Sequence, residues 1–232
     1  MAVSVVPIGF SAAHPISLTE CKEYLRVTGT EQDTVIAHLL NAATDYAETC
    51  TGLTIRATRF QFALDHFPYG YTSVPGITQY VDYSANVPSP YYDGDNIILP
   101  RMPLYDPTED ATLISVSYTN TAGNNASLTI STDFLVDESS MPGRLYLPYN
   151  DTWPQTRAIQ GAVIIQFSAG HRATSDAGPF STSLPDGIRQ AIKILVGHWY
   201  ENREPVVIGA GVNNVPMSVE SLLWANRIVS LT

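Results

Sequence analysis

Basic residues are scarce in this chain of 232 residues. It has 12 lysines and arginines against 22 aspartates and glutamates, which gives a net charge of -10. A protein that holds nucleic acid through its phosphates needs a basic face, because neutralised phosphates supply most of the nonspecific affinity. Between Arg59 and Arg101 there is no basic residue, although four aspartates lie there. We therefore expect either an ordinary solvated acidic surface or a wall past which DNA slides without being held.

Long apolar runs are also missing. The longest uncharged apolar stretch, Val206 to Val212, is far shorter than the roughly 20 residues that a membrane-spanning helix requires. The segment from Met1 to Pro15 has no lysine or arginine before its mildly apolar run, so it lacks the basic start of a secretory signal. The sequence thus predicts a cytosolic product with no membrane partner.

Only two cysteines are present, Cys21 and Cys50, on two predicted helices joined near Gly29. If these helices fold back on each other, Cys21 lies about 12 Å from the turn and Cys50 about 31 Å, at roughly 1.5 Å per residue. A disulfide requires Cα atoms within about 7 Å. We expect two free thiols, and a redox or metal role has neither a CxxC spacing nor a nearby histidine to support it.

The motifs of common catalytic and cofactor sites are absent from the sequence. The five histidines show no HExxH spacing, and neither a GxSxG elbow nor a GxxxxGK[ST] loop occurs. Gly209 and Gly211 follow an apolar run, but the third glycine of a dinucleotide fingerprint is missing, so they indicate a hinge. We expect no enzyme, no cofactor and no metal ion. An undetected hydrolase stays open as an alternative, because any two of the 22 acidic residues could meet in the fold.

Helical patterns occupy both ends of the chain. Ser17 and Glu20 form a capping box, in which the Ser17 hydroxyl accepts from the Glu20 amide and the Glu20 side chain returns to the Ser17 amide. The first helix ends around Gly29, Thr30 caps the second helix, and Gly52 ends it. On the second helix the predicted apolar stripe is Val35, Ile36, Leu39, Leu40, Ala43, Tyr46, Ala47 and Cys50. A third helix opens at Pro185, and its predicted apolar face is Ile188, Ala191, Ile192, Leu195, Val196 and Trp199.

Between these helices the apolar residues recur at every second position. Phe60, Phe62 and Leu64 alternate with more polar neighbours, as a half-buried strand requires. Further strand-like runs lie at 96–99, 112–119, 127–130, 134–136, 144–147 and 162–168. The segment 120–125 is rich in residues that tolerate positive φ and predicts a hairpin.

The expected fold class is α+β. A helical bundle, made of an N-terminal helical hairpin and a C-terminal helix, would carry an inserted antiparallel β sheet or barrel and an extended C-terminal tail. The predicted segments are the helical hairpin 1–53, the inserted β segment 54–183, the core helix 184–204 and the docking tail 205–232.

A segment rich in tyrosine and proline, 68–95, interrupts the β segment. Tyrosine offers a large contact area at modest entropic cost, so we interpret this segment as a protein contact loop. Its six tyrosines are Tyr69, Tyr71, Tyr80, Tyr83, Tyr91 and Tyr92. The alternative is a loop folded onto its own sheet.

The tail 205–232 has its own pattern. Pro205 stops the core helix, Gly209 and Gly211 form the hinge, and a short amphipathic piece follows. An isolated helix this short is marginal in water, so we expect it to leave its own subunit and to pack on a partner, with Leu223 and Trp224 as anchors. The predicted interface residues are Met217, Val219, Leu222, Leu223, Trp224 and Ile228. The alternative is a tail folded back onto its own sheet.

Several segments together carry a family resemblance. They are Ile16 to Val27, the helix end Thr49 to Gly52, Ile98 to Leu104, Ile114 to Tyr118, Trp153 to Arg157, Val163 to Gly170, and most specifically Ile188 to Glu204. In this order they resemble the phage head-tail connector family, also called adaptor or head-completion proteins. The tyrosine-rich segment 68–95 lies outside the resemblance.

The resemblance implies a structural virion protein and not an enzyme. Members of the family form a ring, commonly twelvefold, between the portal and the next stopper or tail protein, and DNA passes through the ring without specific binding. Their C-terminal tail reaches toward the portal. For this chain we expect synthesis in the host cytoplasm and a final place in the virion neck, between head and tail. A carbohydrate- or host-binding module of a virion is the alternative, because antiparallel strands and exposed aromatic rings also suit sugars.

Overall fold

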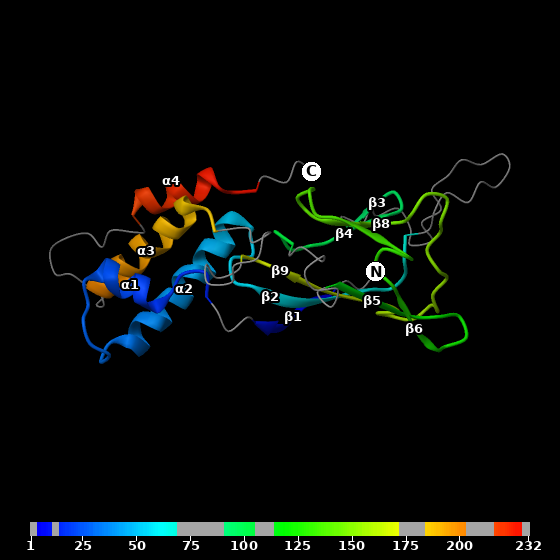
Figure 1. The fold of residues 1–232 in the computed structure, drawn as a ribbon, viewed down its shortest axis with the longest axis horizontal. Coiled ribbons are helices and arrows are strands. Elements are labelled where there is room, and N and C mark those ends of the chain that lie inside the picture. Colours follow the sequence, from blue (N-terminus) through cyan, green and yellow to red (C-terminus); the bar gives the residue numbers. More distant parts are fainter. Residues whose placement is uncertain are drawn as a thin grey trace. The chain divides into compact units, whose positions relative to one another are not determined.

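The computed structural model describes residues 4–10, 14–68, 91–104, 114–171, 184–202 and 216–228. The chain forms two compact units (Figure 1). We call them the β unit, which comprises Met1–Phe10 and Thr58–Gly170, and the helical unit, which comprises Ser11–Ala57 and His171–Thr232. In the described ranges no helix is long and apolar enough to cross a membrane. The α+β class is confirmed.

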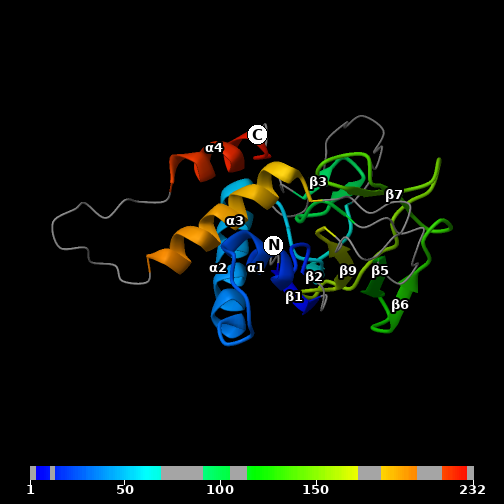
Figure 2. The same cartoon turned by 60° about the vertical axis from the view of Figure 1, so that its left-hand side comes forward.

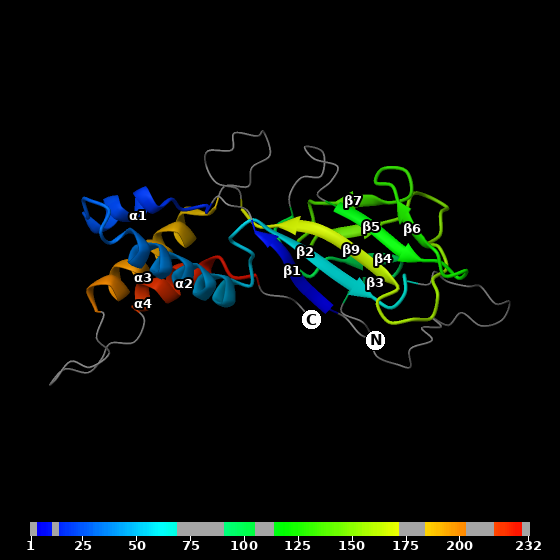
Figure 3. The ribbon, with the colours of Figure 1, turned by 90° about the horizontal axis from the view of Figure 1, so that it is seen from below.

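A five-stranded antiparallel sheet forms one layer of the β unit (Figure 3). Its strands, in spatial order, are β1 (Ser4–Phe10), β2 (Thr58–Leu64), β9 (Val163–Ala169), β5 (Ile114–Thr119) and β6 (Asn125–Leu128). The predicted alternation is confirmed in β2, where Phe60, Phe62 and Leu64 are buried and the residues between them are half-buried. The predicted hairpin joins β5 to β6, and Gly123 supplies a positive φ of 91° in its turn.

A smaller four-stranded sheet forms the second layer of the β unit. Its strands, in spatial order, are β3 (Tyr92–Asp93), β4 (Asn96–Ile98), β8 (Arg144–Tyr146) and β7 (Leu135–Asp137). The two sheets share one apolar core, in which Phe67 stacks on Trp153 with ring centroids 4.9 Å apart. The buried Trp153 indole donates to the Asp95 carbonyl over 2.6 Å, so its polar atom is satisfied. The sheets stay separate, so of the two predicted forms the open sheet is correct and the closed barrel is wrong.

Strand β1 was not predicted from the sequence. It pairs with β2, and the register shifts between Pro7 and Gly9. Proline has no N–H to donate to a neighbouring strand, and glycine weakens a strand. Because this edge strand contains both, its sequence does not show a typical strand pattern. The predicted helical segment 1–53 therefore needs a correction, because residues 4–10 belong to the β unit.

The helical unit contains α1 (Leu18–Leu25), α2 (Asp33–Thr51), α3 (Asp186–Glu201) and α4 (Met217–Ala225) (Figure 2). Helix α3 packs against each of the other three, and α2 also packs against α1 and α4. The predicted face of α3 is confirmed, except that Trp199 is only half-buried. Its buried residues are Ile188, Ala191, Ile192, Leu195 and Val196.

The buried face of α2 is rotated from the predicted stripe. Val35 is 40% exposed, and Leu39 is only half-buried. Thr44 and Thr51 are buried in their place, because their hydroxyls donate to the carbonyls one turn earlier over 2.7 Å. A satisfied threonine can thus occupy a core position that a purely apolar pattern does not assign to it.

The predicted caps are confirmed in part. The Ser17 hydroxyl accepts from the Glu20 amide over 3.1 Å, and Gly52 ends α2 with a φ of 74°. The Glu20 carboxylate, however, pairs with Arg189 (2.9 Å) and Lys193 (3.2 Å) of α3, and so joins α1 to α3. Thr30 is not the cap of α2, because the helix begins at Asp33 and its N-cap position is Gln32.

His14 precedes α1 and is fixed by hydrogen bonds on both ring nitrogens. Its Nδ1 accepts from the Ile16 amide over 3.1 Å, so Nε2 carries the proton of the neutral ring and faces the Thr44 hydroxyl at 3.0 Å. Burial, together with the positive charge of Arg56, lowers the pKa of His14 from its ordinary 6.5 to about 4.

Truncation to alanine should have a larger effect on stability at Leu195 than at Leu39. Leu195 is 1% exposed, so Leu195→Ala should lower the free energy of unfolding by about 2–5 kcal/mol, because it leaves a cavity. Leu39→Ala should cost less than half as much, since Leu39 is only half-buried. Urea and thermal unfolding of both variants measure this, and an equal loss would contradict the observed orientation of α2.

Acid should destabilise the helical unit through His14. The unfolded chain binds a proton on His14 below pH 6.5, whereas the folded chain resists protonation down to about pH 4. Stability should therefore be lost as the pH falls through this window, by on the order of 1–3 kcal/mol. Urea unfolding at several pH values should show a shallower loss for His14→Gln than for the wild type. Parallel curves would show that His14 does not resist protonation in the fold.

Candidate functional site

Helix α4 lies on the helices of its own unit. Val219 and Leu223, one turn apart, are 0% and 1% exposed, and α4 packs against α2 and α3 (Figure 2). Beyond its end, the Ile228 amide donates to the Thr51 carbonyl at the end of α2 over 3.1 Å. We call the surface of α2 and α3 under α4 the α4 seat.

In the single chain residues 216–228 pack on α2 and α3 and not on the sheet, because two apolar side chains of α4 fill the seat. The expectation that this segment meets a partner in the assembly stays a prediction. Of the predicted interface residues, Val219 and Leu223 are buried within the helical unit, while Leu222 and Ile228 are half-buried. Leu223 is therefore not an anchor for an outside partner in this conformation. The predicted hinge residues Gly209 and Gly211 lie outside the described ranges.

The opposite face of α4 carries the other two predicted interface residues. Met217 and Trp224 are 83% and 68% exposed, and a spacing of seven residues places them on one side of the helix. The Arg227 guanidinium lies 5.0 Å from the centre of the Trp224 ring, within reach of a cation–π contact. Tryptophan and arginine are enriched among the residues that dominate binding energy at interfaces. The Met217/Trp224 face is thus a candidate contact surface on a helix whose other side is covered.

The predicted contact loop is described only at its end. Tyr69, Tyr71, Tyr80 and Tyr83 lie outside the described ranges. The Tyr91 ring packs 5.2 Å from that of Phe62, and the Tyr92 hydroxyl donates to the His66 carbonyl over 2.6 Å. These two tyrosines pack onto their own β unit, which is the alternative that we gave for the loop.

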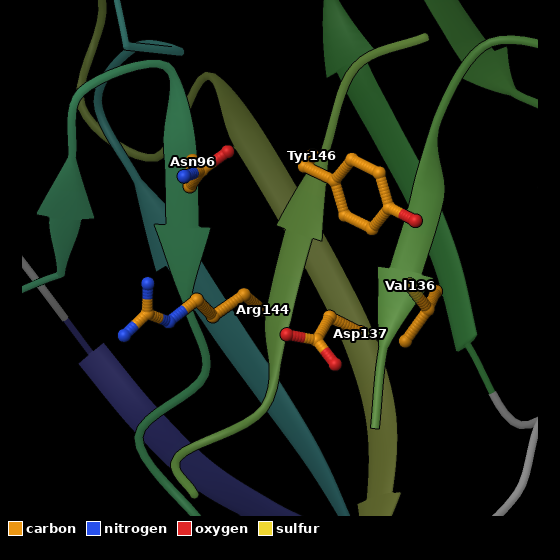
Figure 4. Close-up of a pocket in the computed structure, with 5 residues that line it drawn as sticks. All are labelled: Asn96, Val136, Asp137, Arg144 and Tyr146. Carbon is orange, nitrogen blue, oxygen red and sulfur yellow. The ribbon is translucent and has the colours of Figure 1, made fainter. Parts of the chain in front are cut away.

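A hollow of about 330 Å³ lies on the smaller sheet of the β unit (Figure 4). It is lined by Asn96 of β4, Arg144 and Tyr146 of β8, and Val136 and Asp137 of β7. This set offers hydrogen-bonding groups beside one aromatic ring. Arg144 is already paired with an aspartate of β3, at 2.8 Å.

The carboxylate that lines this hollow is held by hydrogen bonds from a nearby serine. The Asp137 carboxylate accepts from the amide and the hydroxyl of Ser139, and these hydrogen bonds lower its pKa. A carboxyl with a lowered pKa stays ionised near neutral pH and is a poor general acid. Among the described residues, no group of three or more histidines, cysteines or acids could hold a metal ion.

Both cysteines are free, as expected. Cys21 is buried in the helical unit, and burial raises the pKa of its thiol to about 11. The thiolate, which is the reactive form, is therefore negligible near neutral pH.

Comparison with known proteins gives two kinds of likeness. Residues 15–84 match the model of the family described as Phage gp6-like head-tail connector protein, which confirms the resemblance over that range. The match ends inside the tyrosine-rich segment. No curated protein sequence matches the chain.

Solved structures extend the likeness of fold to nearly the whole chain. One, described as "Neck of empty GTA particle computed with C6 symmetry", is 20% identical with a TM-score of 0.62 and covers 100% of this chain and 98% of its own. A second, "Virion of native gene transfer agent (GTA) particle", is 18% identical with a TM-score of 0.63 and covers 98% and 97%. A third, "Neck of native GTA particle computed with C12 symmetry", is 18% identical with a TM-score of 0.58 and covers 98% and 97%. The β segment, which lies mostly beyond the family match, thus has counterparts of the same fold.

Truncation of single side chains on the two faces of α4 should have different effects on stability. Leu223→Ala should destabilise the seated helix and increase hydrogen exchange at the α4 amides, because it removes a fully buried side chain. Trp224→Ala should change the free energy of unfolding by less than about 0.5 kcal/mol, since its ring is mostly exposed. Thermal melts and exchange measurements would contradict the observed orientation if Trp224→Ala were the more damaging change.

Proposed function

We propose that this chain, which matches the Phage gp6-like head-tail connector family over residues 15–84, is a structural protein of a virion neck. The family match is the observation that carries the proposal. It is supported by the fold, which is shared over nearly the full length with proteins from necks of particles. The function would be mechanical: a ring of copies beneath the portal that joins it to a stopper or tail protein.

The proposal of a ring is supported by the symmetry that the descriptions of the similar structures name. Two of them are described as necks computed with C6 and C12 symmetry. A subunit that contacts its neighbours head to tail forms a closed ring when the rotation between copies closes. We infer a ring of identical copies, with a dodecamer as the expected size.

The Met217/Trp224 face of α4 is our candidate for the portal contact. It presents large apolar side chains next to the charge of Arg227. A helix that carries apolar residues on opposite sides is typically covered by other surfaces on both sides. The α4 seat covers one side, so a partner is expected on the other.

DNA passage agrees with the charge of the chain. A net charge of -10 and only 12 basic residues leave little to hold phosphates, so DNA would move through the ring without specific binding. We assign no catalytic step to the chain.

Glycan binding is the second candidate function. It is supported by the hollow on the smaller sheet, where Tyr146 offers an aromatic ring beside the amide of Asn96 and the charged groups of Asp137 and Arg144. Such a module would act as a monomer, so the two functions differ in oligomeric mass.

The portal contact should depend on Trp224. We expect the purified chain to form a ring by mass measurement, and to bind portal-bearing heads in a sedimentation assay. Trp224→Ala should weaken head binding by on the order of 30-fold, as expected for an interface anchor worth about 2 kcal/mol.

Tyr149→Ala is a matched control, because Tyr149 is a fully exposed aromatic residue of the β unit. It should bind heads as the wild type does. Undiminished binding by Trp224→Ala would overturn the α4 assignment. A monomer with glycan affinity that Tyr146→Ala abolishes would favour the second candidate.

A further inference from the structure

We propose that neighbouring copies in the ring are joined through the edges of the five-stranded sheet, with β1 of one copy lying beside β6 of the next. The partner at each edge is a second copy of this chain. This inference rests on the proposed ring and goes beyond it, because it names the two surfaces that join one copy to the next.

Two open edges lie at opposite ends of this sheet. Among the residues that the structure describes, β1 pairs with no strand other than β2, and β6 with none other than β5 (Figure 3). An edge strand presents backbone N–H and C=O groups to which another strand can bond. A head-to-tail ring requires two different surfaces on each copy, one for each neighbour, and the two edges supply such a pair.

Both edges are free of charged side chains. No aspartate, glutamate, lysine or arginine precedes Glu20, and none lies between Asp110 and Asp133, so neither β1 nor β6 carries one. Copies with a net charge of -10 repel one another, and contacts between them are therefore favoured where acidic residues are absent. The uncharged edges thus suit a second copy better than a basic partner, which an acidic surface would attract.

Strand β1 also exposes apolar side chains. Val6 and Ile8 are 47% and 45% exposed, whereas Val5 packs against the core of the β unit. Proteins commonly protect an edge strand with charged side chains, above all lysine, and β1 has none. An uncharged edge with exposed apolar residues is expected to be covered by another strand.

The two edges also match in direction and length. Every neighbouring pair in the sheet is antiparallel, so β1 and β6, four steps apart, run in the same direction. A neighbour related by a small rotation therefore presents its β6 parallel to β1, and the result is a mixed sheet, which is a common arrangement. Pro7 has no N–H and the register shifts beside it, which leaves residues 4–6 to face the four residues of β6.

An added charge on either edge tests the pairing. We would make Val6→Asp on β1 and Ser127→Asp on β6, both at exposed positions. Each change should reduce the mass of the assembly from that of a ring to that of a single chain, because the new carboxylate would have to be buried beside the neighbouring strand. Ser115→Asp is the matched control, since it adds the same charge at an exposed position of β5, away from both edges. It should leave the ring intact.

Mixing the two edge variants tests whether the two surfaces differ. Each variant retains one unchanged edge, so an equal mixture should sediment as dimers that neither variant forms alone. Such dimers would also show that both variants are folded. A mixture that stays monomeric would contradict the pairing, and so would dimers formed by Ser127→Asp alone, since these would indicate contact between two β1 edges.

The mass of the wild-type assembly distinguishes this inference from the proposed function. A wild-type ring that both edge variants still form, or that Ser115→Asp disrupts equally, would overturn the edge pairing and leave the proposed ring standing. A wild-type chain that forms no ring would overturn both.

Discussion

The antiparallel pairing of β2 with β9 allows one chain to build two units. Every residue of β2 has a partner in β9, from Thr58 opposite Ala169 to Leu64 opposite Val163. These strands are the first and the last of the long β insertion, so their pairing brings its two ends together. The residues just outside the insertion, in the helical unit, are also held together, since the His171 amide donates to the Ile55 carbonyl over 3.0 Å. The helices before and after the insertion can therefore share a core as if it were not there.

Sequence patterns predicted the elements that a single chemical signal defines. The face of α3 and the alternation of β2 follow from side-chain period alone, and both are confirmed. The Ser17 cap follows from local hydrogen bonding. The predictions failed where a distant residue competes for the same group. Glu20 fits a capping box, but its carboxylate lies near two cations of α3, and the ion pairs prevail over a bond to an exposed amide.

The candidate site shows a different limit of sequence analysis. The spacing of apolar residues predicted a short helix here and its apolar residues, but such a pattern does not reveal which surface the apolar face packs against. All four of Met217, Val219, Leu223 and Trp224 were expected to meet a partner, but in the single chain Val219 and Leu223 fill the seat while Met217 and Trp224 stay exposed. Gly187, which lies beside the Asn226 side chain, and the Thr51 carbonyl, which accepts from the Ile228 amide, are far from α4 in sequence. Neither residue has a local pattern that would point to the C-terminal helix.

A helix attached in this way has physical consequences for assembly. Release of α4 would expose Val219, Leu223 and the surface of α2 and α3 beneath them. With α4 seated, a subunit can exist alone without exposing that apolar surface, and aggregation is limited before a partner is met. Once a partner covers the Met217/Trp224 face, α4 is packed on both sides, and the free energy of that contact adds to the free energy of seating. The attachment of α4 would then be stronger in the complex than in the single chain, because the second surface is supplied only by assembly.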